Sequence, residues 1–291
     1  MAVKRLISAA LAAALGLMSA AVAAAQQGQS NSGVRIFNTA KQKLAAGKQI
    51  VGGTVSSPDP DVYCAMASSG FDFTWIEMQH SPLTYSEVAK MIWACRGATA
   101  IPFIRVPDAT EGDIQKATDI GALGIIIPMV DTIEKVKNAV RFAKYPPLGV
   151  RSQGGGQYRA LWGADYRQAA NDNIMIVAMI ESPAGVAIAE QMAAVPGVDV
   201  IFAASTDLSS FSGLKQGDPK YEALVTRIHD VTLKAGLKLG GPSAWKNRHG
   251  YTFFQGPGET SLIRTGAQVS LGQSPAATRG IAPTEGEEKK Q

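Results

Sequence analysis

The run Ile174-Met175-Ile176-Val177-Ala178-Met179-Ile180 stops at Glu181, and this stretch decides the fold. It has the length of a strand, and its unbroken apolar composition is typical of a strand buried on both faces. Seven further strands are predicted at 49–54, 72–77, 100–105, 123–128, 198–202, 237–240 and 251–254. Segments of helical period lie between them, at about 59–68, 84–96, 111–120, 131–143, 184–194, 219–235, 243–249 and 260–270. This alternation of eight units favours an α/β fold, an eight-stranded β/α (TIM-type) barrel, over an open sheet.

Four of the predicted strands run into polar residues that can bind metal or move protons. Glu77 ends the second strand and His80 follows it, Arg105 ends the third, Glu181 follows the fifth and Asp207 follows the sixth. The C-terminal ends of barrel strands form one rim, where catalytic groups lie. We therefore expect these side chains to form a metal-assisted enzyme site.

The N-terminus has the pattern of a secretory signal peptide over residues 1–25. Lys4 and Arg5 precede an apolar, alanine-rich segment, and small residues follow at 23–25. The protein is therefore expected to be exported to the periplasm, with no stable membrane anchor after cleavage. Residues 26–33 are predicted to be a flexible leader, 34–271 the barrel domain and 272–291 a disordered tail.

Charge and cysteine content narrow the function further. Loss of Lys4 and Arg5 lowers the formal net charge from +4 to +2, and the remaining basic residues are scattered, which argues against a nucleic-acid partner. Cys64 and Cys95 are the only cysteines. They could pair in an oxidising compartment, but each lies among apolar residues, and buried free thiols are the preferred interpretation.

One predicted connection, from Tyr145 to Asn173, is too long for a tight turn. It contains the glycine run 154–156 with Arg151 and Arg159 on either side. Long loops in compact domains tend to be functional or to mediate assembly. The two arginines could meet a second carboxylate of the substrate, and a solvated loop explains them equally well.

Seven segments in this order and spacing carry a resemblance that each alone would not. They are Glu77-Met78-Gln79-His80-Ser81-Pro82, Ile104-Arg105-Val106-Pro107, Asp119-Ile120-Gly121-Ala122, Ile127-Pro128-Met129-Val130, Tyr145-Pro146-Pro147-Leu148-Gly149-Val150-Arg151, Ile180-Glu181-Ser182 and Thr206-Asp207-Leu208. From about Gly52 to Leu271 the chain resembles the HpcH/HpaI aldolase family, the metal-dependent class II pyruvate aldolases related to citrate lyase β-subunits.

The resemblance implies roles for the rim residues. Glu181 and Asp207 would bind a divalent cation (Mg, Mn or Co), Arg105 would stabilise the enolate of a pyruvate-type 2-oxo acid, and His80 would transfer a proton. Ser205 and Thr206, with Arg105, would bind the substrate. Glu77, Gln79 and Asp119 are possible supporting residues. The expected reaction joins a 2-oxo acid and an aldehyde to a 4-hydroxy-2-oxo acid, or cleaves that product.

The chain departs from the family pattern at three places. Glu77 and Gln79 stand where the family commonly has Asp-Gly-Glu before the histidine, so Gln79 cannot tune His80 as an acid would. Ala204-Ser205 replaces a common Gly-Pro, which weakens the prediction of carboxylate binding at that turn. The segment 255–260 replaces the usual ending of strand eight, and either a recognition loop or a turn into a helix would explain it.

Two other functions remain open, together with the assembly state. Lys238 could form a Schiff base in a class I aldolase, although the two carboxylates would then have no clear task. An exported oxo-acid-binding protein, or a catalytically degenerate family member, would also fit the altered residues around Gln79. The resemblance further implies a homo-oligomer in which the last helix packs on a neighbouring barrel through Leu262, Ile263, Ala267 and Val269.

Overall fold

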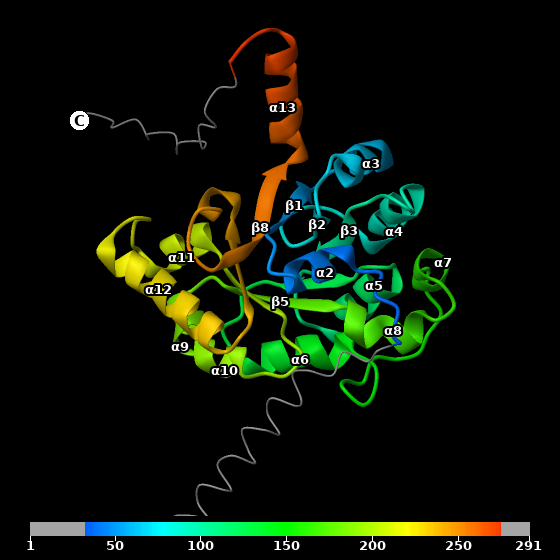
Figure 1. Ribbon diagram of the computed structural model, residues 1–291, viewed down its shortest axis with the longest axis horizontal. Helices are drawn as coiled ribbons and strands as arrows, with labels where there is room; N and C mark the ends of the chain where they lie inside the picture. Colours follow the sequence, from blue (N-terminus) through cyan, green and yellow to red (C-terminus); the bar gives the residue numbers. More distant parts are fainter. Residues whose placement is uncertain (1–32, 275–291) are drawn as a thin grey trace, which may run out of the picture. The chain divides into compact units, whose positions relative to one another are not determined.

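The computed structural model describes residues 33–274, and the compact unit begins at Ile36. Its eight parallel strands close into a barrel in chain order, so the predicted TIM-type fold is confirmed (Figure 1). The strands are β1 (Ile50–Val55), β2 (Phe73–Glu77), β3 (Ile101–Arg105), β4 (Gly124–Ile127), β5 (Met175–Ile180), β6 (Val200–Ala203), β7 (Lys238–Pro242) and β8 (Tyr251–Gly258). The segment 255–258, interpreted above as a loop or turn, continues β8.

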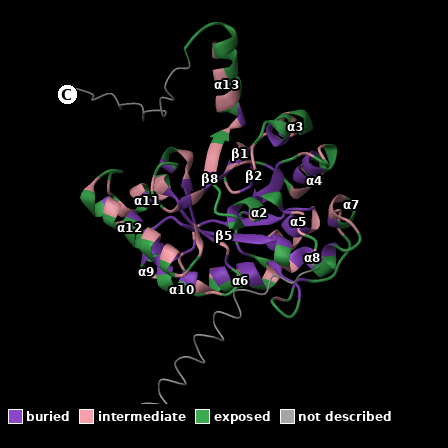
Figure 2. Cartoon of the chain, viewed as in Figure 1, coloured by how far each residue is buried: buried purple, intermediate pink, exposed green. Residues whose placement is uncertain are grey.

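Helices cover the outside of the barrel, and Figure 2 shows buried faces of these helices against it; α13 is the exception, because it projects away from the barrel. They are α2 (Thr39–Ala45), α3 (Pro60–Ser68), α4 (Tyr85–Ala94), α5 (Glu111–Asp119), α6 (Ile133–Ala143), α7 (Tyr158–Trp162), α8 (Tyr166–Asn173), α9 (Pro183–Ala187), α10 (Ala189–Ala193), α11 (Ser205–Ser212), α12 (Pro219–Lys234), η1 (Ser243–Trp245) and α13 (Glu259–Ser270). The sequence did not predict α2, α7, α8 or α11. The predicted helix at 184–194 is divided at Ile188, and that at 243–249 is only a 3₁₀ turn.

Aromatic side chains fill the barrel interior below the rim. The rings of Phe73 and Phe103 have centroids 4.6 Å apart, and those of Phe73 and Phe253 are 4.7 Å apart. Glycines make room for them: a Cβ at Gly52 would lie 2.2 Å from the Phe73 ring, and one at Gly124 would lie 2.1 Å from the Phe103 ring. Large rings opposite glycines therefore fill the barrel interior below the rim.

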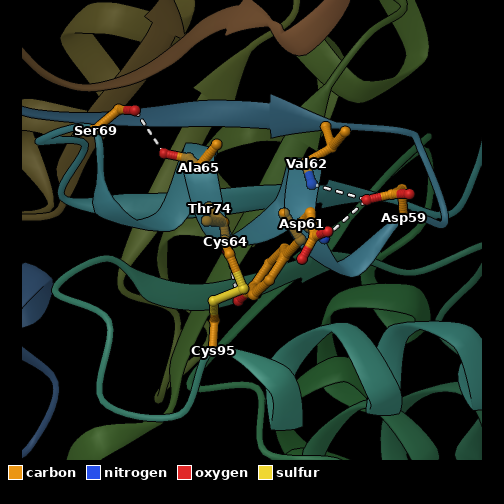
Figure 3. Close-up of a disulfide and its surroundings, with 9 residues drawn as sticks. Asp59, Asp61, Val62, Cys64, Ala65, Ser69, Thr74 and Cys95 are labelled. Carbon is orange, nitrogen blue, oxygen red and sulfur yellow. Dashed lines mark hydrogen bonds between the residues drawn. A yellow bond between two sulfur atoms is a disulfide. The ribbon is translucent and has the colours of Figure 1, made fainter.

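The two cysteines form a disulfide, so the expectation of buried free thiols is wrong. Cys64 lies in α3 and Cys95 directly follows α4, and their Cα atoms are 5.4 Å apart (Figure 3). Helices that follow neighbouring strands pack side by side on a barrel, and this brings together two residues 31 positions apart.

The predicted ends of the chain are largely outside the described residues. The signal peptide (1–25) lies there entirely, as do most of the leader (26–33) and of the tail (272–291). Within residues 33–274, no helix combines the length and the apolar character that crossing a membrane requires.

Candidate active site at the C-terminal rim

Glu77 and Arg105 are direct neighbours in the barrel, because strand register pairs the last residue of β2 with the last residue of β3. Both side chains are buried, and Arg105 Nε lies 3.1 Å from Glu77 Oε2. The pair is an ion pair by distance, although the geometry at Nε is not that of a hydrogen bond. Neither terminal nitrogen of Arg105 donates to another described residue, so both are available to a substrate oxygen.

The carboxylate of Glu77 is fully used by its surroundings. Oε1 accepts the backbone N–H groups of Gln79 at 2.9 Å and His80 at 3.1 Å. Oε2 accepts the indole N–H of Trp75 at 3.2 Å in addition to facing Arg105. Glu77 therefore fixes Arg105 and the turn that carries His80, and it holds His80 through the backbone rather than through the imidazole.

Trp75 is a site residue that the sequence analysis missed. It is fully buried, its ring packs on Phe202 with centroids 5.3 Å apart, and its N–H points to Glu77. The signal was present in the sequence, since Phe73, Trp75 and Glu77 alternate along one strand and must share the inward face.

His80 lies at the edge of the site. Its side chain is exposed, and its ring makes no hydrogen bond to any residue in the described part of the chain. The neighbouring Gln79 is partly exposed, and its Oε1 is buried without a partner. The imidazole is therefore open to solvent at the barrel mouth.

Glu181 is the most buried charged group of the rim, at 1% exposed. Its Oε2 accepts the backbone N–H of Met129 at 2.8 Å, and its Oε1 is buried with no partner. Burial raises the pKa of Glu181 to about 7, against the opposing effects of the Met129 N–H and of Arg105. The charge of Asp207 adds to this rise in pKa, so the two carboxylates lie within electrostatic reach of each other.

Asp207 lies in the first turn of α11, a helix that begins directly after β6. Ser205 and Thr206 belong to the same turn, and no side chain caps the helix start. Their backbone N–H groups donate to no carbonyl in the described residues, as is usual for the first turn of a helix, and they lie at the helix end that favours anions. The segment Ala204-Ser205, which replaces the common Gly-Pro, thus leads into a helix N-terminus, and carboxylate binding there stays a prediction.

The donor set fits a hard divalent cation. A buried carboxylate oxygen without a partner is costly unless a cation or a proton satisfies it. Glu181 Oε1 is such an oxygen, and Asp207 supplies a second carboxylate nearby. Residues 33–274 hold no cluster of three or more His, Cys, Asp or Glu side chains for a metal. Two carboxylates with substrate and water oxygens completing the shell suit Mg or a similar ion.

Three candidates from the sequence do not reach this rim. Asp119 ends α5 and pairs with Arg151 at 2.8 Å, and helices run antiparallel to the strands, so both lie at the opposite end of the barrel. The expectation that Asp119 supports the site is therefore corrected, and Arg151 cannot meet the substrate's second carboxylate. Lys238 is the first residue of β7 and thus also at the N-terminal end, which removes the basis for a Schiff base there.

Comparison with known proteins agrees with the geometry. Residues 54–238 match the HpcH/HpaI aldolase/citrate lyase family. The chain is 34% identical to a hydroxypyruvate/pyruvate aldolase of Chromohalobacter salexigens, over 71% of this chain and 85% of that one. It is 30% identical to a 2-keto-3-deoxy-L-rhamnonate aldolase of Salmonella schwarzengrund, over 72% of this chain and 81% of the relative.

Solved structures show the same likeness. A HpcH/HpaI aldolase/citrate lyase family protein from Burkholderia cenocepacia superimposes with a TM-score of 0.73 at 27% identity, covering 81% of this chain and 98% of that one. The strand-end residues, the closed barrel and these matches lead to one conclusion: the chain belongs to the HpcH/HpaI aldolase/citrate lyase family of lyases.

Proposed function

We propose that the protein is a metal-dependent class II aldolase that cleaves or forms 4-hydroxy-2-oxo acids, with a pyruvate-type 2-oxo acid and an aldehyde as the other partners. The observation that carries this proposal is the buried, unpartnered Oε1 of Glu181 beside Asp207 and Arg105. Burying a carboxylate oxygen without a partner is costly, and a bound cation would offset that cost. The names of the relatives, which are aldolases of 2-oxo acids, support the substrate class.

Glu181 and Asp207 would hold the cation, which we propose to be Mg, Mn or Co. When bound, it supplies Lewis-acid polarisation of the 2-oxo acid carbonyl. Met129 contributes by fixing one oxygen of Glu181 through its backbone N–H, which leaves the other oxygen directed to the ligand. The first turn of α11 offers the N–H groups of Ser205 and Thr206 to the substrate carboxylate.

Arg105 would stabilise the charge that develops on the keto oxygen. Cleavage breaks the C3–C4 bond of the hydroxy-oxo acid, and its electron pair passes to C3 as an enolate, which later takes up a proton to give the 2-oxo acid. The Glu77 carboxylate holds Arg105 in place before substrate arrives, so little reorganisation is needed at the moment of reaction. The guanidinium cannot lose its own proton to the enolate.

His80 would act on the aldehyde side. In cleavage the C4 hydroxyl must lose a proton as the aldehyde carbonyl forms, and in synthesis the same oxygen must regain one. An exposed imidazole at the barrel mouth can take up and return that proton, directly or through water. Nothing in the fold holds the ring against Glu77, so the proton transfer does not involve that carboxylate.

A metal-replacement experiment tests this function. Chelation should abolish cleavage of a 4-hydroxy-2-oxo acid, and added Mg, Mn or Co should restore it. Asp207→Asn and Glu181→Gln should lose the bound metal and activity together, whereas Glu190→Gln, at an exposed ion pair with Arg227, should keep both. Borohydride with pyruvate should leave no adduct on Lys238. Metal binding without turnover of any hydroxy-oxo acid would favour the binding-protein alternative instead.

We also propose that the protein is exported. The signal-peptide pattern at residues 1–25 supports this, and so does the Cys64–Cys95 disulfide, because disulfides persist mainly in oxidising compartments such as the periplasm. Cell fractionation with antibody detection tests it, and recovery of the uncleaved chain with cytoplasmic markers would contradict it.

A further inference from the structure

A second polar cavity lies at the end of the barrel opposite the aldol site. It has a volume of about 290 Å³ and is formed by the long connection between α6 and β5. Gln157 Nε2 ties this connection to the carbonyl of Ile120 at 2.6 Å, and Trp162 Nε1 ties it to the carbonyl of Gly121 at 2.9 Å. Both carbonyls follow the last turn of α5, which fixes the cavity at the N-terminal end of the strands; Figure 1 shows α7 and α8 beside α5, away from α13.

The lining of this cavity is positively charged. Arg159 and Arg167 both line it, and no acidic residue does. Arg167 donates to neutral oxygens, the carbonyls of Gln153 at 3.0 Å and Gly154 at 2.8 Å, so its charge is not neutralised there. Arg159 is exposed and forms no ion pair with any residue of the described chain. A cavity with two unneutralised guanidinium groups attracts anions.

The backbone adds further donors. The N–H groups of Gly154, Gly155 and Gly156 make no hydrogen bond within the described residues. A Cβ at Gly154 or Gly155 would meet no atom within 4 Å, so an approaching ligand finds space there. At Gly156 a Cβ would lie 2.5 Å from the carbonyl oxygen of Asp119, so only glycine allows the loop to pack this closely.

Aromatic side chains make the opposite wall rigid. The rings of Tyr158 and Tyr166 stack with centroids 4.3 Å apart, and the Tyr158 hydroxyl donates to the Gly154 carbonyl at 2.7 Å. Behind them Arg151 is buried, pairs with Asp119 and donates to the Tyr166 hydroxyl at 2.8 Å. The charge of Arg151 is thus used within the wall, and the cavity keeps its shape without a ligand.

We propose that this cavity binds a small dianion, a phosphate or a short dicarboxylate, at a site separate from the aldol centre. Two guanidinium groups match two negative charges, and the glycine N–H groups supply the neutral donors that oxyanions accept. The volume excludes a large ligand and accommodates either class. The inference does not depend on the proposed aldol activity.

Calorimetric titration of the full mature protein with inorganic phosphate, and separately with succinate, tests the proposal at low ionic strength. Arg159→Gln is the decisive variant, because the exposed Arg159 side chain forms no hydrogen bond or ion pair with a described residue that its loss would break. We expect at least one of the two anions to bind, and Arg159→Gln to weaken that binding about tenfold or more. Arg141→Gln, which removes an exposed arginine from α6, should leave the affinity unchanged, and so should Asp207→Asn at the rim.

Three results would overturn the proposal. Equal affinity in the wild type and Arg159→Gln would mean an adventitious ion only. Loss of binding in Asp207→Asn with retention in Arg159→Gln would move the anion to the aldol site. A change of molecular mass in Arg159→Gln with no change in anion affinity would make the cavity a contact between copies of the chain. If the proposal holds, preference for phosphate over succinate, or the reverse, identifies the chemical class of the bound anion.

Discussion

Met129 donates its backbone N–H to Glu181 Oε2 over 2.8 Å while its own φ is 51°. Among the described residues it is the only one other than glycine with a positive φ. This conformation costs about 1–2 kcal/mol for an L-residue with a side chain, and such strain is found where a site requires it. Here the strained peptide binds one Glu181 oxygen and leaves the other without a protein partner, where the proposed cation would bind.

Two isomeric substitutions test this relationship. Met129→Leu keeps an unbranched Cβ and should bind the cation as the wild type does. Met129→Ile has nearly the same volume but a branched Cβ, which strongly disfavours a positive φ. We expect the turn to shift in Met129→Ile and the cation affinity to fall about tenfold or more, since tenfold corresponds to only about 1.4 kcal/mol. Titration with Mn²⁺ measures both, and equal affinities in the pair would contradict the role of the strained peptide.

Glu181 should destabilise the metal-free protein at neutral and higher pH. Its pKa is raised to about 7 from an ordinary 4.5, so its favourable contribution is complete below pH 4.5 and is lost as the pH rises through 7. Glu181→Gln carries no such charge and should be more stable than the wild type at pH 8.5, by up to about 3 kcal/mol. The difference should shrink toward pH 5.

Urea unfolding of the chelated proteins at several pH values measures this difference. Glu190→Gln, on an exposed position of α10, is the control and should show no comparable trend. Addition of Mg²⁺ should then stabilise the wild type and leave Glu181→Gln unchanged, because a ligand that binds only the folded state shifts unfolding by mass action. A pH-independent difference between the two chains would show that the buried carboxylate is not the cause.

The sequence predicted the barrel and the strand-end residues because both follow from strand length and period. An apolar run has to end where the strand leaves the core, and Glu77, Arg105 and Glu181 mark those ends. It did not predict α11, because Ser205-Thr206-Asp207 is a polar segment whose helical state depends on the tertiary position after β6. The positive φ of Met129 could not be predicted from the sequence either, since methionine has no preference for positive φ.

The cysteine pairing and the location of Asp119 were missed for a different reason. The apolar neighbours of Cys64 suggested a buried thiol, yet both cysteines are partly exposed and meet only because α3 and α4 pack side by side. Asp119 belongs to a family motif, but the motif ends a helix at the far end of the barrel, where it fixes Arg151. A motif thus indicates a family without indicating the end of the barrel at which each member lies.

The proposed roles of Arg105 and His80 should be distinguishable by enzyme kinetics. Arg105→Lys should keep the cation but lose much of the rate of both pyruvate enolisation and aldol cleavage, because an ammonium cannot reproduce the planar donors that Glu77 holds in place. His80→Ala should also keep the cation, yet slow cleavage more than enolisation, because the proposed proton transfer of His80 is to and from the aldehyde oxygen. Exchange of the pyruvate methyl protons by NMR measures enolisation alone. Unchanged kinetics in both variants would contradict the scheme.

The disulfide should contribute substantially to stability. It closes a loop of 31 residues between α3 and α4, and the chain-entropy relation gives about 3–4 kcal/mol for a loop of this size. The double variant Cys64→Ser/Cys95→Ser should therefore unfold at lower urea concentration than the wild type. A reducing agent should bring the wild type to the same midpoint and leave the variant unaffected. If the reducing agent does not move the wild-type midpoint, the bridge is absent in solution.

The last helix should mediate self-association, as the resemblance implies. Glu259 is the one buried residue of α13, and its Oε1 accepts the N–H groups of Ser56 and Ser57 at 2.9 Å, which anchors the start of the helix to the barrel. Beyond this anchor Ile263 is 63% exposed and Val269 is 58% exposed. Apolar side chains presented in this way are typical of a surface that a second copy covers.

Light scattering of the mature wild type should therefore give a mass greater than one chain, and Ile263→Asp should lower it, because an aspartate buried between two copies loses its hydration. Thr260→Asp adds the same charge near the anchored end of the helix and should leave the mass unchanged. A wild-type monomer at micromolar concentration would contradict the prediction, as would equal masses in the wild type and Ile263→Asp.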